Sequence, residues 1–488
     1  MSSPAAATSL APTENVISPS KMKERSRNKA DNNKPMSPSR LKIDSRDDAE
    51  SHDALPPSSH LPTPRSSNMT KEQDMELEME DSPRTQKQKR LMTKLRAPDP
   101  TLAELLDVLT DFGNISHLRR VNACGAIKAL TLHKANQIPL ARTKGVVTGI
   151  TSVLCAVNAS EEERTRCINA LMHLCVPEEN WKLVYLFPQT PEALARNMAD
   201  KYPQIRYAAC LATNFLAKKN RRDVVKNRLL MYAMGRVLEV DKNGALDTMS
   251  VQDKKVFVGA RLCVLKMLLH LSKNKDISNT LARTECVTST LVSVASTMEM
   301  AANILCIATL TNLTRHPDNA YHLVFSSPDL VNTFVRHVDL ADAECNKCAL
   351  FALQNLSCKT NCRQELANMP GLLGSVTKAA FRHDCPEQQL SALHTLKNLS
   401  DDPFNLVTMT NTPGCTATLL ALANNDKRTN VSGNNTMVQY LACDTLATLS
   451  HWLLTLSTTR KSKENGGNCG GNDIGRRTFQ QSTWEAWT

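Results

Sequence analysis

Hydrophobic residues recur with helical spacing through the middle of the chain, and this pattern is missing from both ends. The first patterned stretch, DPTLAELLDVLTDFGN, places its leucines three and four residues apart, as on one face of a helix. Asp99 suits the N-cap of this helix and Pro100 its first position. The pattern predicts helical structure over residues 99–456, a disordered Ser/Pro/charged arm over 1–98 and a disordered Gly/Asn-rich tail over 457–488.

The phrase Leu-x-Asn-Leu-Ser/Thr occurs three times at a spacing of 43 residues. Aligning its second leucine with the nearest equivalents gives eight anchors, and five of the seven intervals between them are 41–44 residues long. The two longer intervals contain polar inserts at 241–253 and 424–435. A period of about 42 residues is typical of helical solenoids, whose units bury their apolar faces against one another. The anchors are Leu130, Leu174, Phe215, Leu271, Leu313, Leu356, Leu399 and Leu449.

Two further marks repeat in phase with the anchors. An asparagine follows most of them by five or six residues, and a glycine follows three of them later in the repeat. Asparagine caps helices and glycine permits sharp bends, so both predict loops between helices. The residues are Asn136, Asn180, Asn220, Asn319, Asn361 and Asn405, with Gly145, Gly371 and Gly414.

The phrases ALFALQNLSCKTN and SALHTLKNLSDDPFN resemble the third helix of an armadillo repeat and the loop after it. The resemblance covers roughly residues 100–456 and is strongest over 302–456. It implies an all-α, right-handed superhelical solenoid of about eight armadillo-like repeats, with three helices each and the third helices lining a concave groove. In that family, the asparagine of this phrase points into the groove and bonds the backbone of an extended peptide.

Helical spacing places further positions, four and seven or eight residues before each such asparagine, on the same face. Bases and amides dominate the resulting set, which contains no carboxylate, and the chain carries a net charge of +11. We therefore expect the groove to bind extended acidic or phosphorylated segments of other proteins. The candidate residues are Arg166, His173, Arg206, Asn214, Lys266, His270, Asn312, Lys347, Phe351, Asn355, His394 and Asn398.

A non-enzymatic scaffold or adaptor fits these observations best, and two other functions remain open. An importin-α-like nuclear transport adaptor would carry tryptophan four residues before the groove asparagine, where this chain has Cys210, Ala308, Phe351 and His394. Nucleic-acid binding through the basic face is disfavoured because few aromatic residues offer surfaces for base stacking. An armadillo ubiquitin ligase would need a U-box-like domain, which the arm does not provide.

Composition narrows the class of protein further. The sequence contains no nucleotide-binding or hydrolase motif, so we expect neither an enzyme nor a cofactor. Its 16 cysteines are scattered singly through apolar stretches, as in reduced intracellular proteins. With no signal sequence and no apolar run of membrane-spanning length, we expect a monomer in the cytoplasm, the nucleus or both.

A zinc site is suggested by two cysteine pairs, Cys345-x2-Cys348 and Cys358-x3-Cys362. However, the helical pattern continues between the pairs and would hold them about 15 Å apart, so we expect no metal.

The arm contains basic clusters at 21–29 and 84–96, each either a nuclear localisation signal or a solvated charge run. It also contains six carboxylates within residues 71–81. One hypothesis is that this acidic stretch covers the N-terminal part of the basic groove, and the alternative is a charge-balanced linker.

Overall fold

The computed structural model describes residues 86, 94–239, 249–424 and 434–465, except positions 114, 298, 299, 341 and 383. These residues belong to one compact unit that begins at residue 79. The regular elements among them are helices, accompanied by a single isolated bridge between Arg96 and Thr143. The acidic stretch 71–81, the basic cluster 21–29 and most of the tail lie outside the described residues.

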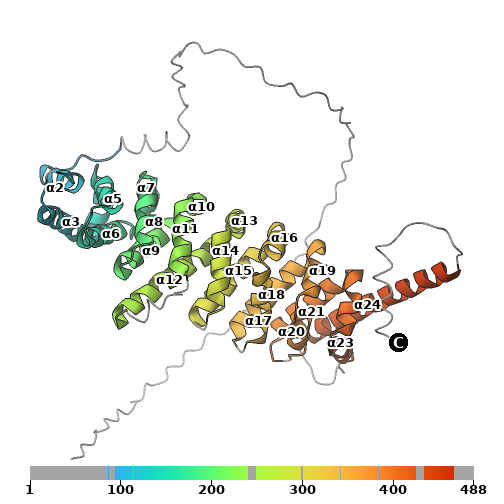
Figure 1. The fold of residues 1–488 in the computed structure, drawn as a ribbon. Coiled ribbons are helices and arrows are strands. Elements are labelled where there is room, and N and C mark those ends of the chain that lie inside the picture. Colours follow the sequence, from blue (N-terminus) through green and yellow to red (C-terminus); the bar gives the residue numbers. More distant parts are fainter. Residues whose placement is uncertain are drawn as a thin grey trace, which may run out of the picture. The chain divides into compact units, whose positions relative to one another are not determined.

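The helices follow one another in units of three, after a first unit of two (Figure 1). The first unit contains α2 (Pro100–Thr110) and α3 (His117–Leu132). The first helices of the later units are α4 (Lys134–Ala141), α7 (Glu178–Leu186), α10 (Arg221–Lys226), α13 (Lys275–Ala282), α16 (Pro317–Ser326), α19 (Thr360–Asn368) and α22 (Leu406–Asn411), the last preceded by η1 (Pro403–Asn405).

The second and third helices of each unit are longer on average than the first. The second helices are α5 (Val146–Cys155), α8 (Thr190–Met198), α11 (Arg228–Leu238), α14 (Glu285–Ala295), α17 (Pro328–Asp339), α20 (Leu372–Ala380) and α23 (Cys415–Ala423). The third helices are α6 (Glu161–Leu174), α9 (Pro203–Ala217), α12 (Val251–Ser272), α15 (Met300–Thr314), α18 (Ala343–Ser357), α21 (Pro386–Ser400) and α24 (Asn434–Asn465).

Helices that hold the same position in successive units stack on one another along the array. Each third helix, from α3 to α24, contacts the third helix of the next unit. The second helices form a row of their own, which begins with α2, continues with α5 and ends with α23. The first helices α10, α13, α16 and α19 form another row. The chain is therefore an all-α solenoid, in which each unit buries its apolar faces against its neighbours.

The predicted anchors supply much of this core. Six of the eight are buried on third helices, five of them close to the C-terminal end of the helix, and Leu356 and Leu399 are completely inaccessible. Leu130 is the first exception: it lies on α3, in the two-helix first unit, and is 36% exposed. Phe215 is the second exception, since it is only partly buried while the adjacent Leu216 is fully buried.

The three predicted glycine bends are confirmed. Gly145, Gly371 and Gly414 stand at the N-caps of α5, α20 and α23 with left-handed φ angles of 91°, 78° and 79°. Only glycine adopts this conformation without steric cost, so each one turns the chain sharply from a first helix into a second.

Regular contacts are present close to both predicted domain boundaries. The backbone of Arg96 accepts a hydrogen bond from Lys144 (2.8 Å) and donates one to Arg142 (2.9 Å), so the end of the arm is tied to the first units. At the other end, α24 continues to Asn465, past the expected boundary at 456. Neither glycine nor proline interrupts the chain there until Gly466, so nothing local ends the helix earlier.

Candidate peptide-binding face

Three asparagines link consecutive third helices. Each donates a hydrogen bond from Nδ2 to a serine or threonine hydroxyl on the preceding third helix, about one repeat earlier in the sequence. We call this set the asparagine ladder, and the row of third helices that carries it the third-helix face. The pairs are Asn312–Ser272 (3.0 Å), Asn355–Thr314 (3.1 Å) and Asn398–Ser357 (3.0 Å).

The ladder hydroxyls fix the direction of each amide. Every hydroxyl donates its own proton to a carbonyl three residues earlier in its helix, at 2.8–2.9 Å. Because the proton is used there, the hydroxyl oxygen accepts from the asparagine, and the amide nitrogen must point along the array. Within the described residues, the side-chain oxygens of Asn355 and Asn398 receive no hydrogen bond, and both side chains are half-buried. Each therefore retains an acceptor for a ligand.

The loop asparagines Asn180 and Asn405 have a different role, because each one bonds backbone carbonyls of the preceding unit from a buried position. Asn180 is completely buried and donates to the carbonyls of Leu174 and Gln137, both at 2.9 Å. Asn405 repeats this arrangement with Leu399 (3.0 Å) and Arg363 (3.2 Å). Each one begins a new unit, caps the third helix of the preceding unit and bonds the first helix of that same preceding unit.

In the N-terminal units, the predicted arginines are occupied by the protein itself. Arg166 donates to the carbonyl of Val121 at 2.8 Å and pairs with Glu162. Arg206 donates twice to the carbonyl of Asp200, at 3.0 and 2.7 Å. These guanidinium groups hold neighbouring segments together rather than standing open on the third-helix face.

His173 and Asn214 differ in how they relate to the ladder. Nδ1 of His173 lies 3.4 Å from the hydroxyl of Thr131, so a histidine occupies the ladder position in α6. Asn214 is out of register: the buried anchor of α9 is Leu216, which places Phe215 at the ladder position. The sequence did not resolve this because both Phe215 and Leu216 are apolar, and helical periodicity accepts either as the anchor.

The middle of the face carries open positive charge. Lys266 and His270 are exposed on α12, and Lys266 has no ion pair with the described residues. Burial lowers the pKa of His270, and the positive charges of Arg221, Lys273 and Lys218 lower it further.

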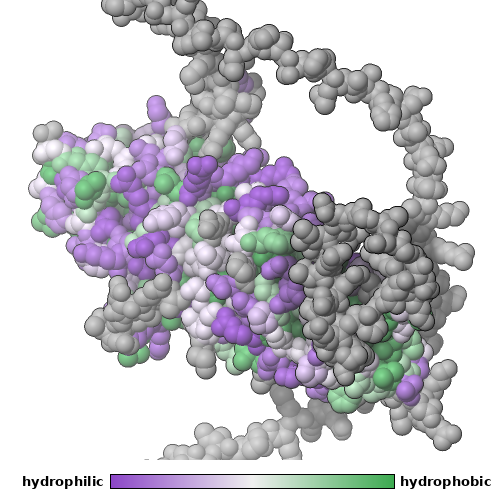
Figure 2. All heavy atoms as spheres, turned by 45° about the vertical axis from the view of Figure 1, so that its right-hand side comes forward, coloured by the Kyte–Doolittle hydropathy of each residue, from purple (hydrophilic) through white to green (hydrophobic). Residues whose placement is uncertain are grey.

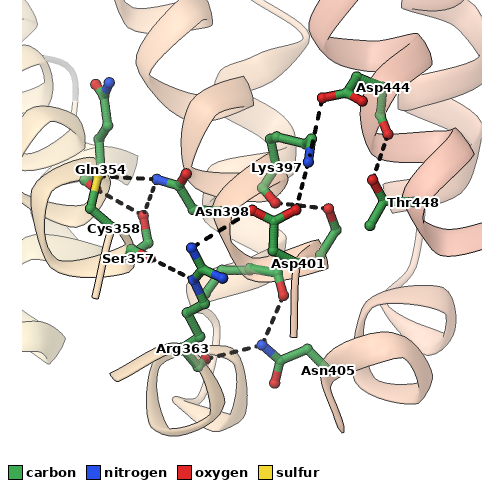
Figure 3. A network of polar contacts seen from close by, with 12 residues as sticks. Gln354, Ser357, Cys358, Arg363, Lys397, Asn398, Asp401, Asn405, Asp444 and Thr448 are labelled. Carbon is green, nitrogen blue, oxygen red and sulfur yellow. Dashed lines mark hydrogen bonds and ion pairs between the residues drawn. The ribbon is translucent and has the colours of Figure 1, made fainter. Parts of the chain in front are cut away.

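The C-terminal units are charge-balanced, contrary to the expectation of a face without carboxylates. Lys347 pairs with Glu387. Figure 3 shows Lys397 between two carboxylates, Asp401 at 2.5 Å and Asp444 at 3.4 Å. Burial alone would lower the pKa of Lys397, but these carboxylates raise it. The acids were missed because they come from the ends of helices and from the neighbouring repeat, outside the positions given by helical spacing.

Phe351 and His394 complete the predicted set. Both are half-buried, four residues before the ladder asparagines of α18 and α21. Burial lowers the pKa of His394.

Among the described residues, no three histidine, cysteine, aspartate or glutamate side chains lie together in a group that could hold a metal ion. Burial, followed by the hydrogen bond and charge of Asp342, raises the pKa of Cys345 to about 12, so this thiol stays protonated. Among the same residues, no helix has both the length and the apolar character needed to cross a membrane.

No protein-family model and no curated protein matches the sequence. Among solved structures, it is similar to a designed armadillo repeat protein in complex with the peptide (KR)4, with 17% identity and a TM-score of 0.38 over 52% of this chain and 99% of that one. It is also similar to a chain from a structure described as a phosphorylation switch controlling the interaction between cadherin and beta-catenin. That match has 16% identity and a TM-score of 0.47 over 71% of this chain and 60% of the other.

The fold is an armadillo-like repeat solenoid. This assignment rests on the three-helix units, the stacked rows and the glycine bends seen directly in the structure.

Proposed function

We propose that this chain is a non-enzymatic scaffold that binds extended segments of other proteins along its third-helix face. The asparagine ladder is the observation that carries this proposal. An extended backbone presents both N–H donors and C=O acceptors, and a side-chain amide offers both kinds of partner. Since the ladder hydroxyls hold the amides of Asn355 and Asn398 in one orientation, a bound segment would meet preordered groups.

The charges favour an acidic ligand over the middle of the face. Lys266 is exposed there without an ion pair to the described residues, whereas Lys347 and Lys397 are paired with carboxylates. An acidic segment would therefore gain most at α12 and would have to compete with protein carboxylates at α18 and α21. The importin-α-like alternative predicts the opposite preference, for lysine-rich segments.

A peptide array and two variants test the proposal. The array should contain acidic, phosphorylated and lysine-rich ten-residue peptides, and the best binder is then labelled for fluorescence anisotropy with the full chain. Replacing Asn355 and Asn398 with alanine should weaken its binding about tenfold or more, because two hydrogen bonds to the ligand are lost. The matched control is Asn361→Ala, which removes an exposed asparagine from α19, outside the third-helix face.

The charge preference has its own test. Lys266→Glu should weaken binding of an acidic peptide more than Lys347→Glu, because Lys347 is already neutralised by Glu387. If lysine-rich peptides bind best, the acidic preference is wrong and the transport-adaptor function replaces it. If the asparagine double variant binds as well as the parent chain, the ladder does not hold the ligand.

A further inference from the structure

A row of cations lies where third helices end and the next first helices begin. Lys218 follows α9, Lys273 follows α12 and Arg315 follows α15, and all three side chains are exposed. Arg221 and Lys275 stand at the starts of α10 and α13, beside two of these loops. We call these five residues the basic edge.

The basic edge is continuous in space. α10 contacts α13, and α13 contacts α16, so the three loops lie in consecutive positions along the array. Packed helices are about 8–10 Å apart, which sets the step between one loop and the next. Figure 2 shows hydrophilic residues gathered along the upper edge of the array, where Figure 1 places α10 and α13.

Two carboxylates near the basic edge pair with basic side chains that are not part of it. Glu178 pairs with Lys219 at 2.5 Å, and Asp276 pairs with Arg222 at 2.6 Å. Asp223 and Asp318 also lie close in sequence, in the first turns of α10 and α16. Within the described residues, none of the five basic-edge side chains forms an ion pair with a carboxylate.

Lys218 and Arg221 are held in place at one end of the row. The ammonium of Lys218 lies 5.2 Å from the centroid of the Trp181 ring and 5.5 Å from that of Phe215. Nε of Arg221 donates to the carbonyl of Lys218 at 3.2 Å. Both side chains are therefore held in place by contacts other than an ion pair with a carboxylate of the described residues.

The lowered pKa values of two histidines indicate that cations from neighbouring repeats act on the same side chains. Burial lowers the pKa of His270, and Arg221, Lys273 and Lys218 lower it further from two successive repeats. Burial also lowers the pKa of His316, helped by Lys275 and Arg315 and opposed by Asp318. Positive potential therefore extends along the edge across repeat boundaries.

We propose that the basic edge is a second binding surface, separate from the asparagine ladder, for an extended acidic or phosphorylated protein segment. An extended chain advances about 3.3 Å per residue, so every third residue meets the next repeat, and roughly seven residues span the three loops. A protein segment is favoured over single-stranded nucleic acid because the two rings at the Lys218 end of the edge are covered and not open for base stacking. Trp181 is 8% exposed, and Lys218 lies against both it and Phe215.

The test uses a fluorescein-labelled twelve-residue peptide with glutamate at every third position, bound to the full chain at about 100 mM salt. The edge variant replaces Lys218, Arg221, Lys273 and Arg315 with glutamine. Four exposed ion pairs are lost, so binding should weaken roughly tenfold to a hundredfold. A matched control variant removes the same charge from other exposed sites, and it should bind nearly as well as the parent chain. Its substitutions are Lys144→Gln, Lys255→Gln, Arg283→Gln and Lys378→Gln.

The remaining outcomes separate this surface from the ladder. The edge substitutions should weaken binding of this peptide by the same factor when Asn355 and Asn398 are also replaced with alanine, because the two surfaces act independently, and circular dichroism should show equal helix content in every variant. If only the ladder variant loses binding, the edge inference fails while the scaffold function stands. Equal binding by the edge variant and the parent chain, or no binding by the parent chain, also overturns it. Tighter binding of a twenty-nucleotide oligothymidine would assign the surface to nucleic acid instead.

Discussion

Replacing Asn180 with alanine should show how strongly adjacent repeats are coupled. The side chain is completely buried and donates to the carbonyls of Leu174 and Gln137, each at 2.9 Å. A hydrogen bond of this kind contributes about 1 kcal/mol net, and a buried carbonyl left without its partner costs about 1–3 kcal/mol more. The side-chain oxygen of Asn180 has no partner among the described residues, so alanine also removes one unfavourable group. We therefore expect a loss of about 2–3 kcal/mol.

The matched control for this substitution is Asn136→Ala. Asn136 occupies the equivalent position one repeat earlier, but it is half-buried and makes one exposed hydrogen bond, to Leu130 at 3.2 Å. Its loss should cost about 0.5 kcal/mol. Urea unfolding followed by circular dichroism measures both variants, and amide hydrogen exchange shows whether protection falls on both sides of the junction between α4 and α7. Equal costs for the two variants would refute the idea that Asn180 couples the repeats.

Three further predictions concern other parts of the array. In α20, Gly374→Ala should stabilise the chain by about 0.5–1 kcal/mol, because no atom lies within 4 Å of the new methyl group. Gly414→Ala should instead destabilise it by about 1–2 kcal/mol, because alanine is strained at the left-handed φ of 79°. Thermal unfolding distinguishes the two signs. Burial alone would raise the pKa of Glu163, but hydrogen bonds from Ser160 and Arg120 outweigh it, and the pKa is lowered. Glu163 therefore stabilises the fold above its unfolded pKa of about 4.3, and this contribution is lost as the pH falls through the folded value. Glu163→Gln should be less stable at pH 7, with the difference shrinking in urea midpoints measured toward pH 3. Finally, if the acidic stretch 71–81 covers basic surface, deleting residues 1–85 should tighten binding of an acidic peptide at low salt, and the effect should shrink as salt rises; equal affinities at low salt would reject this hypothesis.

The sequence was sufficient for features that depend on local chemistry. Helical periodicity gave the repeats, and glycine placement gave the bends at Gly371 and Gly414. The shared face of Asn312, Asn355 and Asn398 also followed from spacing alone. A signal for two of their hydroxyl partners was present in the same phrase, since Asn312 and Asn355 are each followed two residues later by the threonine or serine that accepts from the asparagine of the next repeat.

Features that depend on how repeats stack were not predicted. Glu387 neutralises Lys347 from the next unit, and Asp444 reaches Lys397 from α24. Such pairs depend on which helix ends come together, and a periodic pattern does not contain that information. The one-residue displacement in α9 was missed for a related reason: burial of Leu216 depends on neighbouring helices, not on hydrophobicity alone.

Two of the three ladder pairs have the same separation in sequence, and this has a consequence for how such a chain can change length. Asn398 bonds Ser357 and Asn355 bonds Thr314, and in both pairs the residues are 41 positions apart. If residues 315–357 were removed in one piece, Asn398 would be brought to Thr314, which offers the same kind of acceptor. The junctions between repeats are thus interchangeable, and the array can be shortened or extended by whole modules through deletion or duplication of coding sequence. A cut that is not a whole repeat long would bring mismatched side chains together at the new junction.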